Sequence, residues 1–397
     1  MHIVESFALN SGLKIGKPYI YEKYFPLSFS GNYITFQPFG KYDSRKYDYW
    51  EETIEILGPI LEKNKIKIVK LGGGNEPDIY GTISLSGRTD YNQTAYLISN
   101  SLLHLGVDSS GVHIASGLDK KIVALYNVMP PSSSGPYWSN KDNVIILEPE
   151  RDKDEKCSYS PVEDPKTINK IKPEKIAESV CKLLGIEFNY PFRTLHIGRS
   201  FQNRKIELIP TNFIRDISQL KIPSLIVRMD IFFEENVLMK QLELVPCSIV
   251  SKLPININLL SFFRKKITEL IFLVDENSDT LYLQELKRKG IKFFLISEKS
   301  EEETNDFKLK YIDIGPIIIK QKNDDTIQKI KEKDLKNIFF KSSSISIIED
   351  KMYMSNSNNS ENVPVDKTRG NNPAPVINEE SFWKNLDDYI ILEKVNN

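Results

Sequence analysis

The chain has 397 residues, of which 40% are hydrophobic and 27% charged, and its formal net charge at pH 7 is −1. This is the composition of an ordinary globular protein, so the chain can bury a sizeable core, and its length favours two domains and a tail. The near-zero net charge argues against a broad basic surface for duplex DNA, although it leaves room for a local basic patch.

Cysteine usage and hydropathy restrict the compartment. The three cysteines, Cys157, Cys181 and Cys247, have neither paired nor metal-ligand spacing, which is typical of free thiols in a reducing environment. No signal-peptide pattern and no apolar run long enough to cross a bilayer is visible in the sequence. We therefore expect a cytoplasmic protein with no transmembrane segment.

The first domain is predicted over residues 1–190, where short apolar strands alternate with helices. The predicted strands include 33–39, 66–72 and 144–149. A helix over 48–64 is indicated by apolar residues at helical spacing, and a second helix over 167–184 closes the domain. The segment 188–191 (FNYP) is a plausible hinge to the next domain.

The segment 87–126 is the most informative part of this domain. It reads as a helix, a buried strand (102–107), a turn at Asp108–Gly111, a second helix and a buried strand (122–126). The peptide N–H groups of the second helix point back at the turn, and a helix N-terminus attracts phosphate. Because the turn follows a strand of a right-handed β-α-β unit, it also lies where open α/β sheets bind ligands. The residues alone therefore predict an anion site at Asp108–Gly111.

Five segments in register carry a family resemblance. They are YITFQPFGKYDSRKYDYW (33–50), IKIVKLGGGNEPD (66–78), ISLSGRTDYNQTAYLISNS (83–101), VDSSGVHIASGLDKKIVALYNVMPP (107–131) and the run from Cys157 to Gly185. Together they resemble the nucleotide-sugar-binding domain of glycosyltransferase family 9, the ADP-heptose:lipopolysaccharide heptosyltransferases, over roughly residues 30–187. The resemblance implies a glycosyltransferase that inverts the sugar, uses no metal or cofactor, and takes a nucleotide sugar as donor substrate.

The resemblance also implies a donor site. The positions that match the family's motifs are Gly40, Arg45, Lys46, Glu76, Asp108, Ser109, Ser110, Gly111 and His113. The serines and Gly111 would hold the diphosphate, with Arg45 and Lys46 neutralising its charge. Asp108 would bind a sugar hydroxyl or order the turn, His113 would reach a phosphate or sugar oxygen, and Glu76 would accept from the ribose or the base.

Each of these residues also has a plainer interpretation. Asp108 could simply cap the helix, and His113 could be a packed histidine. Arg45 and Lys46 could belong to a solvated loop, and the Gly72–Gly74 run could be only a tight turn, since no Lys-Ser/Thr follows it.

The order of the domains departs from the family. Residues 1–27 resemble the family's inter-domain connector, so the acceptor-binding half would be relocated behind the donor domain or replaced. Residues 191–340 alternate strand and helix, with strands expected at 193–198, 205–210, 223–233, 246–252, 268–276, 291–297 and 311–315. This pattern favours a second Rossmann-like domain on the acceptor side, and so a GT-B-like α/β architecture in reversed order. Residues 341–397 would be a hairpin around Glu349, a polar linker (355–380) and a C-terminal helix over 382–395.

The catalytic base is the least defined part of the site. Asp230 and His196 are candidates in the second domain, although both are more typical of structural roles, and no segment there resembles the family's catalytic Gly-Asp loop. The expected partners are a nucleotide sugar and a glycan acceptor. Two alternatives stay open: a glycosyltransferase that modifies nucleic acid or protein, for which 260–266 and 286–290 are faint basic support, and a nucleotide-sugar-binding protein without catalysis.

Overall fold

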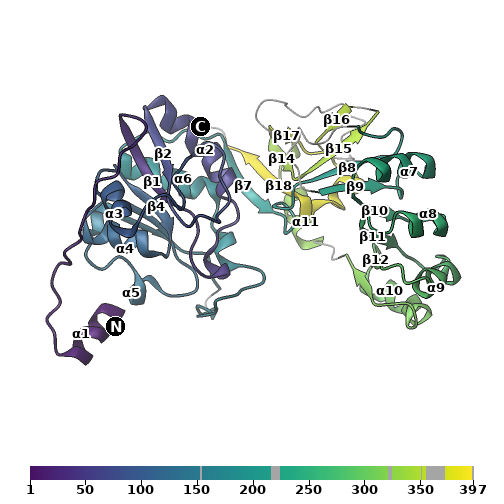
Figure 1. Ribbon diagram of the computed structural model, residues 1–397, viewed down its shortest axis with the longest axis horizontal. Coiled ribbons are helices and arrows are strands. Elements are labelled where there is room, and N and C mark those ends of the chain that lie inside the picture. Colours follow the sequence, from purple (N-terminus) through teal and green to yellow (C-terminus); the bar gives the residue numbers. More distant parts are fainter. Residues whose placement is uncertain (153, 216–223, 321–323, 350, 355–371, 396–397) are drawn as a thin grey trace. The chain divides into compact units, whose positions relative to one another are not determined.

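The computed structural model describes residues 1–152, 154–215, 224–320, 324–349, 351–354 and 372–395. The chain divides into two compact units, Met1–Pro191 and Phe192–Asn397 (Figure 1). The division falls one residue after the predicted end of the first domain. None of the helices in the described ranges is long and apolar enough to cross a membrane.

Unit 1 is built on a six-stranded parallel sheet. Its strands are β1 (Asn32–Gln37), β2 (Ile66–Lys70), β3 (Ile83–Ser84), β4 (His104–Val107), β5 (Ile122–Leu125) and β6 (Val144–Leu147). They lie in the order β3-β2-β1-β4-β5-β6, which is that of a dinucleotide-binding Rossmann fold. The order reverses between β1 and β4, and the carboxyl ends of these two strands therefore flank a topological switch point.

Helices cover both faces of this sheet (Figure 1). On one face, α3 (Tyr91–Ser99) and α4 (Ser110–Gly117) bury their apolar residues in a core with the strands. On the other, α2 (Trp50–Lys63) packs against α6 (Pro173–Leu184). The predicted helix over 167–184 is in fact two pieces, a 3₁₀ turn (Thr167–Lys170) and α6, because Pro173 opens α6 and the extended residues before it end the first turn. The short helices α1 (Ile3–Ser11) and α5 (Pro131–Ser134) complete the unit.

Unit 2 contains an eight-stranded sheet in the order β13-β12-β11-β10-β9-β8-β15-β16, parallel except for the β15–β16 hairpin. The strands are β8 (Lys205–Leu208), β9 (Ser224–Arg228), β10 (Cys247–Ser251), β11 (Ile267–Leu273), β12 (Phe294–Ser297), β13 (Ile317–Ile319), β15 (Ser344–Ile348) and β16 (Lys351–Tyr353). The predicted strand at 311–315 is wrong, because a 3₁₀ turn (Leu309–Tyr311) occupies its start and the strand begins only at Ile317.

This sheet differs from the second Rossmann-like domain that the sequence predicted. From β8 to β13 each strand adds on the same side of the one before it. Right-handed crossovers then place the connecting helices on one face. Between β9 and β13 these are α7 (Glu235–Leu244), α8 (Ile257–Phe262), α9 (Thr280–Arg288) and α10 (Glu301–Lys308), which share a single core (Figure 1). A Rossmann sheet reverses its order near its middle and carries helices on both faces, whereas this sheet reverses only at β8, where β15 joins as a parallel strand on the other side. Alternation along a sequence does not encode strand order, so the two arrangements look alike before folding.

A separate four-stranded antiparallel sheet corrects the prediction for the C-terminus. Its order is β17 (Ala374–Pro375), β14 (Ile338–Ser342), β18 (Tyr389–Lys394), β7 (Phe192–Ile197). The expected C-terminal helix is wrong: a short α-helix (α12, Glu380–Trp383) and a 3₁₀ turn (Leu386–Asp388) precede β18, which is a central strand. Tyr389–Leu392 is buried on both faces of the sheet, and such a continuous apolar run cannot be told from a helix by periodicity.

The C-terminal region is therefore not a separate segment. The predicted boundary after residue 340 cuts through β14, which pairs with β18. The predicted hairpin is present as β15 and β16, and most of the predicted linker, 355–371, lies outside the described residues. A small helix, α11 (Asp324–Lys331), contributes to the core of this sheet.

Candidate functional site

The candidate site of unit 1 lies at the carboxyl ends of β1 and β4, on either side of the switch point. The loop after β1 brings Gly40 and Arg45 to this place, and the turn after β4 brings Asp108 and α4. A Cβ on Gly40 would lie 3.3 Å from the Cβ of Arg45 and 3.6 Å from the backbone oxygen of Asp108. The absence of a side chain at Gly40 therefore lets the two segments meet.

The N-terminus of α4 carries both free and occupied groups. Ser109 is the N-cap residue, but its side chain makes no capping bond, and its buried Oγ has no hydrogen-bond partner among the described atoms. The N–H of Gly111 donates to Oε1 of Gln37 at 3.1 Å. One of the N–H groups predicted to hold a diphosphate is thus already engaged by a protein oxygen.

Arg45, Asp108 and His113 lie together beside this helix end, with Arg45 and Asp108 forming an ion pair. Nη1 of Arg45 lies 3.0 Å from Oδ2 of Asp108, and Nε2 of His113 lies 3.8 Å from Oδ1 of the same carboxylate. Arg45 also approaches the Asp108 backbone oxygen and the sulfur of Met129. The structure brings these three predicted residues together and presents two cationic or polar groups at the end of α4.

Lys46 lies differently. Its ammonium is 3.5 Å from Asp43, and its side chain is 42% exposed, whereas the Arg45 side chain is only 19% exposed. The adjacent pair of cations that the sequence suggested is therefore split into one inward and one outward group.

Glu76 fixes the glycine-rich turn after β2. Its Oε1 accepts from the N–H of Gly73 at 2.8 Å, and its Oε2 lies 3.6 Å from Nζ of the fully buried Lys70. Gly72 has a φ of 150°, and a Cβ there would overlap the Glu76 carboxylate. The contacts in the structure are those of a turn-stabilising residue, and the role of Glu76 toward ribose stays a prediction.

Sequence reasoning missed three polar residues beneath α4: Thr35, Gln37 and His104. His104 is completely buried, and its Nδ1 is 3.0 Å from Oγ1 of Thr35. Burial lowers the pKa of His104 to about 3, so the imidazole is neutral at physiological pH. Thr35 and His104 are partners about 70 positions apart along the chain, and so are Gln37 and Gly111. The only local sign of these contacts was a polar residue inside an otherwise apolar strand.

The two predicted bases of unit 2 lie in different sheets. Asp230, just after β9, accepts from Nε and Nη2 of Arg228 at 2.8 Å each, and Arg228 also contacts Glu207 at 3.1 Å. His196 lies in β7, opposite Ile391 of β18. The structure does not bring them into one group, and Asp230 has the contacts of a structural ion pair.

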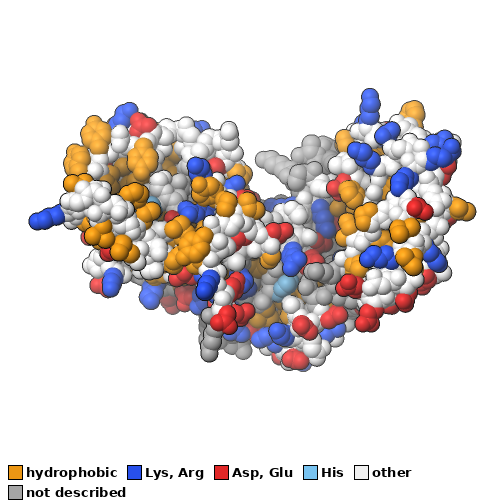
Figure 2. Space-filling model, turned by 90° about the horizontal axis from the view of Figure 1, so that it is seen from below, with side chains coloured by type: hydrophobic (Ala, Val, Ile, Leu, Met, Phe, Trp, Pro, Cys, Tyr) orange, Lys and Arg blue, Asp and Glu red, His pale blue; other side chains and the backbone are white. Residues whose placement is uncertain are grey.

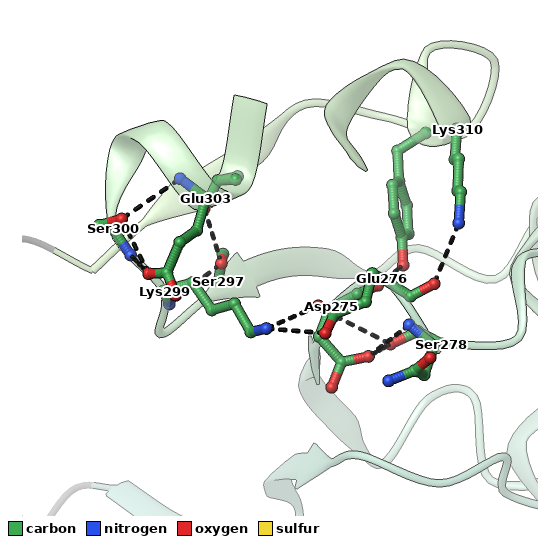
Figure 3. Close-up of polar contacts among 11 residues, drawn as sticks. Asp275, Glu276, Ser278, Ser297, Lys299, Ser300, Glu303 and Lys310 are labelled. Atoms are coloured by element: carbon green, nitrogen blue, oxygen red, sulfur yellow. Dashed lines mark hydrogen bonds and ion pairs between the residues drawn. The ribbon is translucent and has the colours of Figure 1, made fainter. Parts of the chain in front are cut away.

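Another polar cluster of unit 2 lies at the carboxyl ends of β11 and β12 (Figure 3). Lys299 bonds both oxygens of Glu276 at 2.8 and 2.7 Å, which lowers the pKa of that carboxyl. Asp275 accepts from Ser278 and from the N–H of Asn277. These groups satisfy one another and join the loops after the two strands, so we assign the cluster a structural role. No group of His, Cys, Asp and Glu placed to hold a metal occurs in the described ranges.

The region around the switch point matches the sequence model of a protein family. Residues 27–163 match the model of Glycosyltransferase family 9 (heptosyltransferase), as the sequence predicted. No curated protein sequence matches the chain at the required significance.

Several solved structures are similar to part of the chain. ADP-heptose LPS heptosyltransferase II of E. coli has 20% identity and a TM-score of 0.31, and the match covers 40% of this chain and 48% of that one. A glycosyl transferase family 9 protein from Veillonella parvula has 18% identity and a TM-score of 0.32, with 46% and 50% covered. E. coli heptosyltransferase WaaC with ADP has 15% identity and a TM-score of 0.31, with 45% and 54% covered. The chain thus spans about half the length of the solved structures it matches.

Proposed function

We propose that this chain, whose residues 27–163 form a glycosyltransferase family 9 domain, transfers a sugar from a nucleotide-sugar donor to a glycan acceptor. The transfer would invert the anomeric centre and need no metal, because fixed cations and N–H groups of the protein can take the charge of the leaving diphosphate. The family match and the Rossmann strand order support a nucleotide-binding unit.

One observation carries the proposal: Arg45 and the N-terminus of α4 meet at the switch point between β1 and β4. Open α/β sheets bind ligands in the crevice at this position. A guanidinium and a helix N-terminus both favour an anion, and both are fixed before a ligand arrives. The diphosphate of a nucleotide sugar is the ligand that these groups fit.

The mechanism follows from where charge develops. As the acceptor hydroxyl attacks the sugar carbon, the bond to the diphosphate oxygen breaks and that oxygen gains negative charge. Arg45, the unpartnered Ser109 hydroxyl and the remaining N–H groups of α4 would stabilise this charge more strongly in the transition state than in the bound donor. His113, 40% exposed beside Asp108, would donate to a phosphate or sugar oxygen, and Lys46 could fold inward over the diphosphate.

As part of this proposal, we assign the acceptor to unit 2. A cavity of about 240 Å³ lies beyond the ends of β12 and β13, between α11 and α12. Trp383, Leu386 and Ile327 form its apolar part, and lysines and carboxylates surround them. An apolar patch surrounded by donors and acceptors suits a sugar ring, which supports a glycan over a nucleic acid as acceptor. The reversed, GT-B-like order of donor and acceptor domains stays a prediction, as does the catalytic base.

The test has two stages. Calorimetry of the full chain with nucleoside diphosphates and nucleotide sugars should show binding of one nucleotide class. Release of free nucleoside diphosphate from the bound donor, measured with glycan, protein and nucleic-acid acceptors, then identifies the reaction. Binding without turnover on any acceptor would favour a donor-binding protein. If the chain bound none of the nucleotides, the proposal would be refuted.

A further inference from the structure

Gln37 is the last residue of β1 and lies at the switch point, but it is not among the site residues that the sequence predicted. Its Oε1 accepts the N–H of Gly111, 74 positions away, at 3.1 Å. A peptide N–H can only donate, so the carboxamide oxygen must face α4 and the amide nitrogen must be the other arm. The described residues provide no acceptor for this nitrogen, and Gln37 is partly exposed.

The surroundings hold the carboxamide in this orientation. A Cβ on Gly111 would lie 2.2 Å from Oε1 of Gln37, and a Cβ on Gly106 would lie 2.8 Å from the Gln37 backbone oxygen. Gly111 therefore leaves room for the Gln37 side chain, and Gly106 leaves room for its backbone carbonyl. The His104 ring fills the space beneath them, with Nε2 at 2.7 Å from the Gly111 Cβ position. The oxygen arm of the amide is thus held against the N-terminus of α4 by the Gly111 N–H.

The chemistry of this arrangement is unusual for a helix N-terminus. A carboxylate would satisfy the Gly111 N–H equally well and would gain from the helix dipole. A carboxamide satisfies the same N–H without adding negative charge, and the two N–H groups of its amide nitrogen remain available to a ligand. An amide in this place suits a site that must receive an anion.

We propose that Gln37 is a donor-binding residue that selects for the diphosphate: its Nε2 donates to a diphosphate oxygen while Gly111 holds its Oε1. This inference rests on the proposed function, since it names a further contact of the same site. The alternative is that Gln37 only caps α4, in which case the chemistry of its second arm is irrelevant.

Gln37→Glu and Gln37→Met together separate the two. Gln37→Glu keeps an oxygen for the Gly111 N–H and replaces the free amide with a second carboxylate oxygen, and Gln37→Met removes the amide without adding a charge that repels phosphate. Weaker diphosphate binding by Gln37→Glu alone would be charge repulsion and would overturn the inference. Calorimetry of the full chain with ADP, CDP, GDP, UDP and dTDP identifies the nucleotide class bound by the wild type, and the matching nucleoside serves as a phosphate-free probe. We expect Gln37→Glu to weaken diphosphate affinity at least about tenfold and to leave nucleoside affinity within about twofold.

Gln93→Glu is the matched control. Oε1 of Gln93 accepts the N–H of Asp90 at the start of α3, so the same change is made at another helix end of unit 1. We expect no change in diphosphate affinity for this variant and unchanged thermal unfolding for both.

The outcomes distinguish the two proposals. If the wild type binds a diphosphate and Gln37→Glu binds it equally well, Gln37 is only a cap and the inference fails while the proposed function stands. Equal losses for nucleoside and diphosphate would also overturn it, because the effect would not be on phosphate. If the wild type binds no nucleotide, the proposed function itself fails.

Discussion

The guanidinium of Arg45 lies 3.0 Å from the carboxylate of Asp108, although 63 positions separate them in the chain. The Asp108 side chain is only 7% exposed, and Nε of Arg45 is buried without a hydrogen-bond partner. Buried polar atoms without a partner are uncommon. Arg45 is therefore positioned by Asp108 with hydrogen-bonding capacity left over for a second anion.

Arg45→Met should weaken nucleoside diphosphate binding by about 10- to 100-fold, because a charge-assisted contact to phosphate is lost from a partly buried site. Calorimetry measures the effect. Lys41→Met removes a cation from the exposed part of the same loop and should change the affinity by less than about twofold. Equal effects of the two variants would mean that only the net charge of the loop matters.

Gly111→Ala should lower the stability of unit 1 by about 1–3 kcal/mol, because the new methyl group would overlap Gln37 and His104 and force α4 outward. Gly16→Ala is the opposite case: Gly16 is exposed with no atom of a non-neighbouring residue within 4 Å of its Cβ position, and alanine there should stabilise by about 0.4–1 kcal/mol. Urea unfolding should be followed by tryptophan fluorescence in a Trp383→Phe background, where Trp50 and Trp138 report unit 1. Two changes of the same sign would contradict the packing described around Gly111.

The sequence was most informative where chemistry is local. The α4 turn could be predicted because a strand, a small-residue turn and a helix follow one another, and the family resemblance marked the loops after β1 and β2. Gln37 and His104 could not be predicted, because their partners Gly111 and Thr35 belong to other strands and loops.

Unit 2 shows a second limit of prediction from sequence, which is the order of strands in a sheet. Its strands and helices were largely predicted, but their order in space depends on which edge each strand joins. The C-terminal run Tyr389–Leu392 is buried on both faces by β7 and β14, and that burial arises only from tertiary pairing. The local pattern favoured a helix, but pairing with β7 and β14 makes this run a strand.

His104 should make the stability of unit 1 depend on pH. Its pKa is about 3 in the folded chain against 6.5 for the unconstrained side chain. Below pH 6.5 the unfolded state binds a proton that the native state does not, so the free energy of unfolding falls as the pH drops toward 3. From pH 7 to pH 5 this loss is about 2 kcal/mol. His104→Gln should lose that much less stability over the same interval in urea unfolding, and equal slopes for variant and wild type would contradict the burial of a neutral His104.

Ile391 distinguishes the strand β18 from the predicted helix. On the helix the apolar stripe would consist of Phe382, Trp383, Leu386, Ile390 and Leu392, and Ile391 would lie outside it. In the structure Ile391 is fully buried between Phe340 and His196. Ile391→Ala should therefore cost unit 2 about 2–5 kcal/mol, whereas Val395→Ala, at a position 40% exposed just after the strand, should cost under about 0.5 kcal/mol. Tolerance of Ile391→Ala would favour the helix.

Asp230→Asn tests whether the aspartate is a base or a structural ion. Both carboxylate oxygens accept from Arg228, and Glu207 is the other carboxylate in contact with that guanidinium. Removing the Asp230 charge should destabilise unit 2 by about 3 kcal/mol. This is the lower end of the range for breaking a buried ion pair, because Glu207 still pairs with Arg228. The rate of diphosphate release should fall less than about tenfold, whereas the loss of a general base costs about 100- to 10,000-fold. A large loss of rate with unchanged unfolding would make Asp230 the base, and the bidentate contact with Arg228 would then be a resting arrangement that the acceptor displaces.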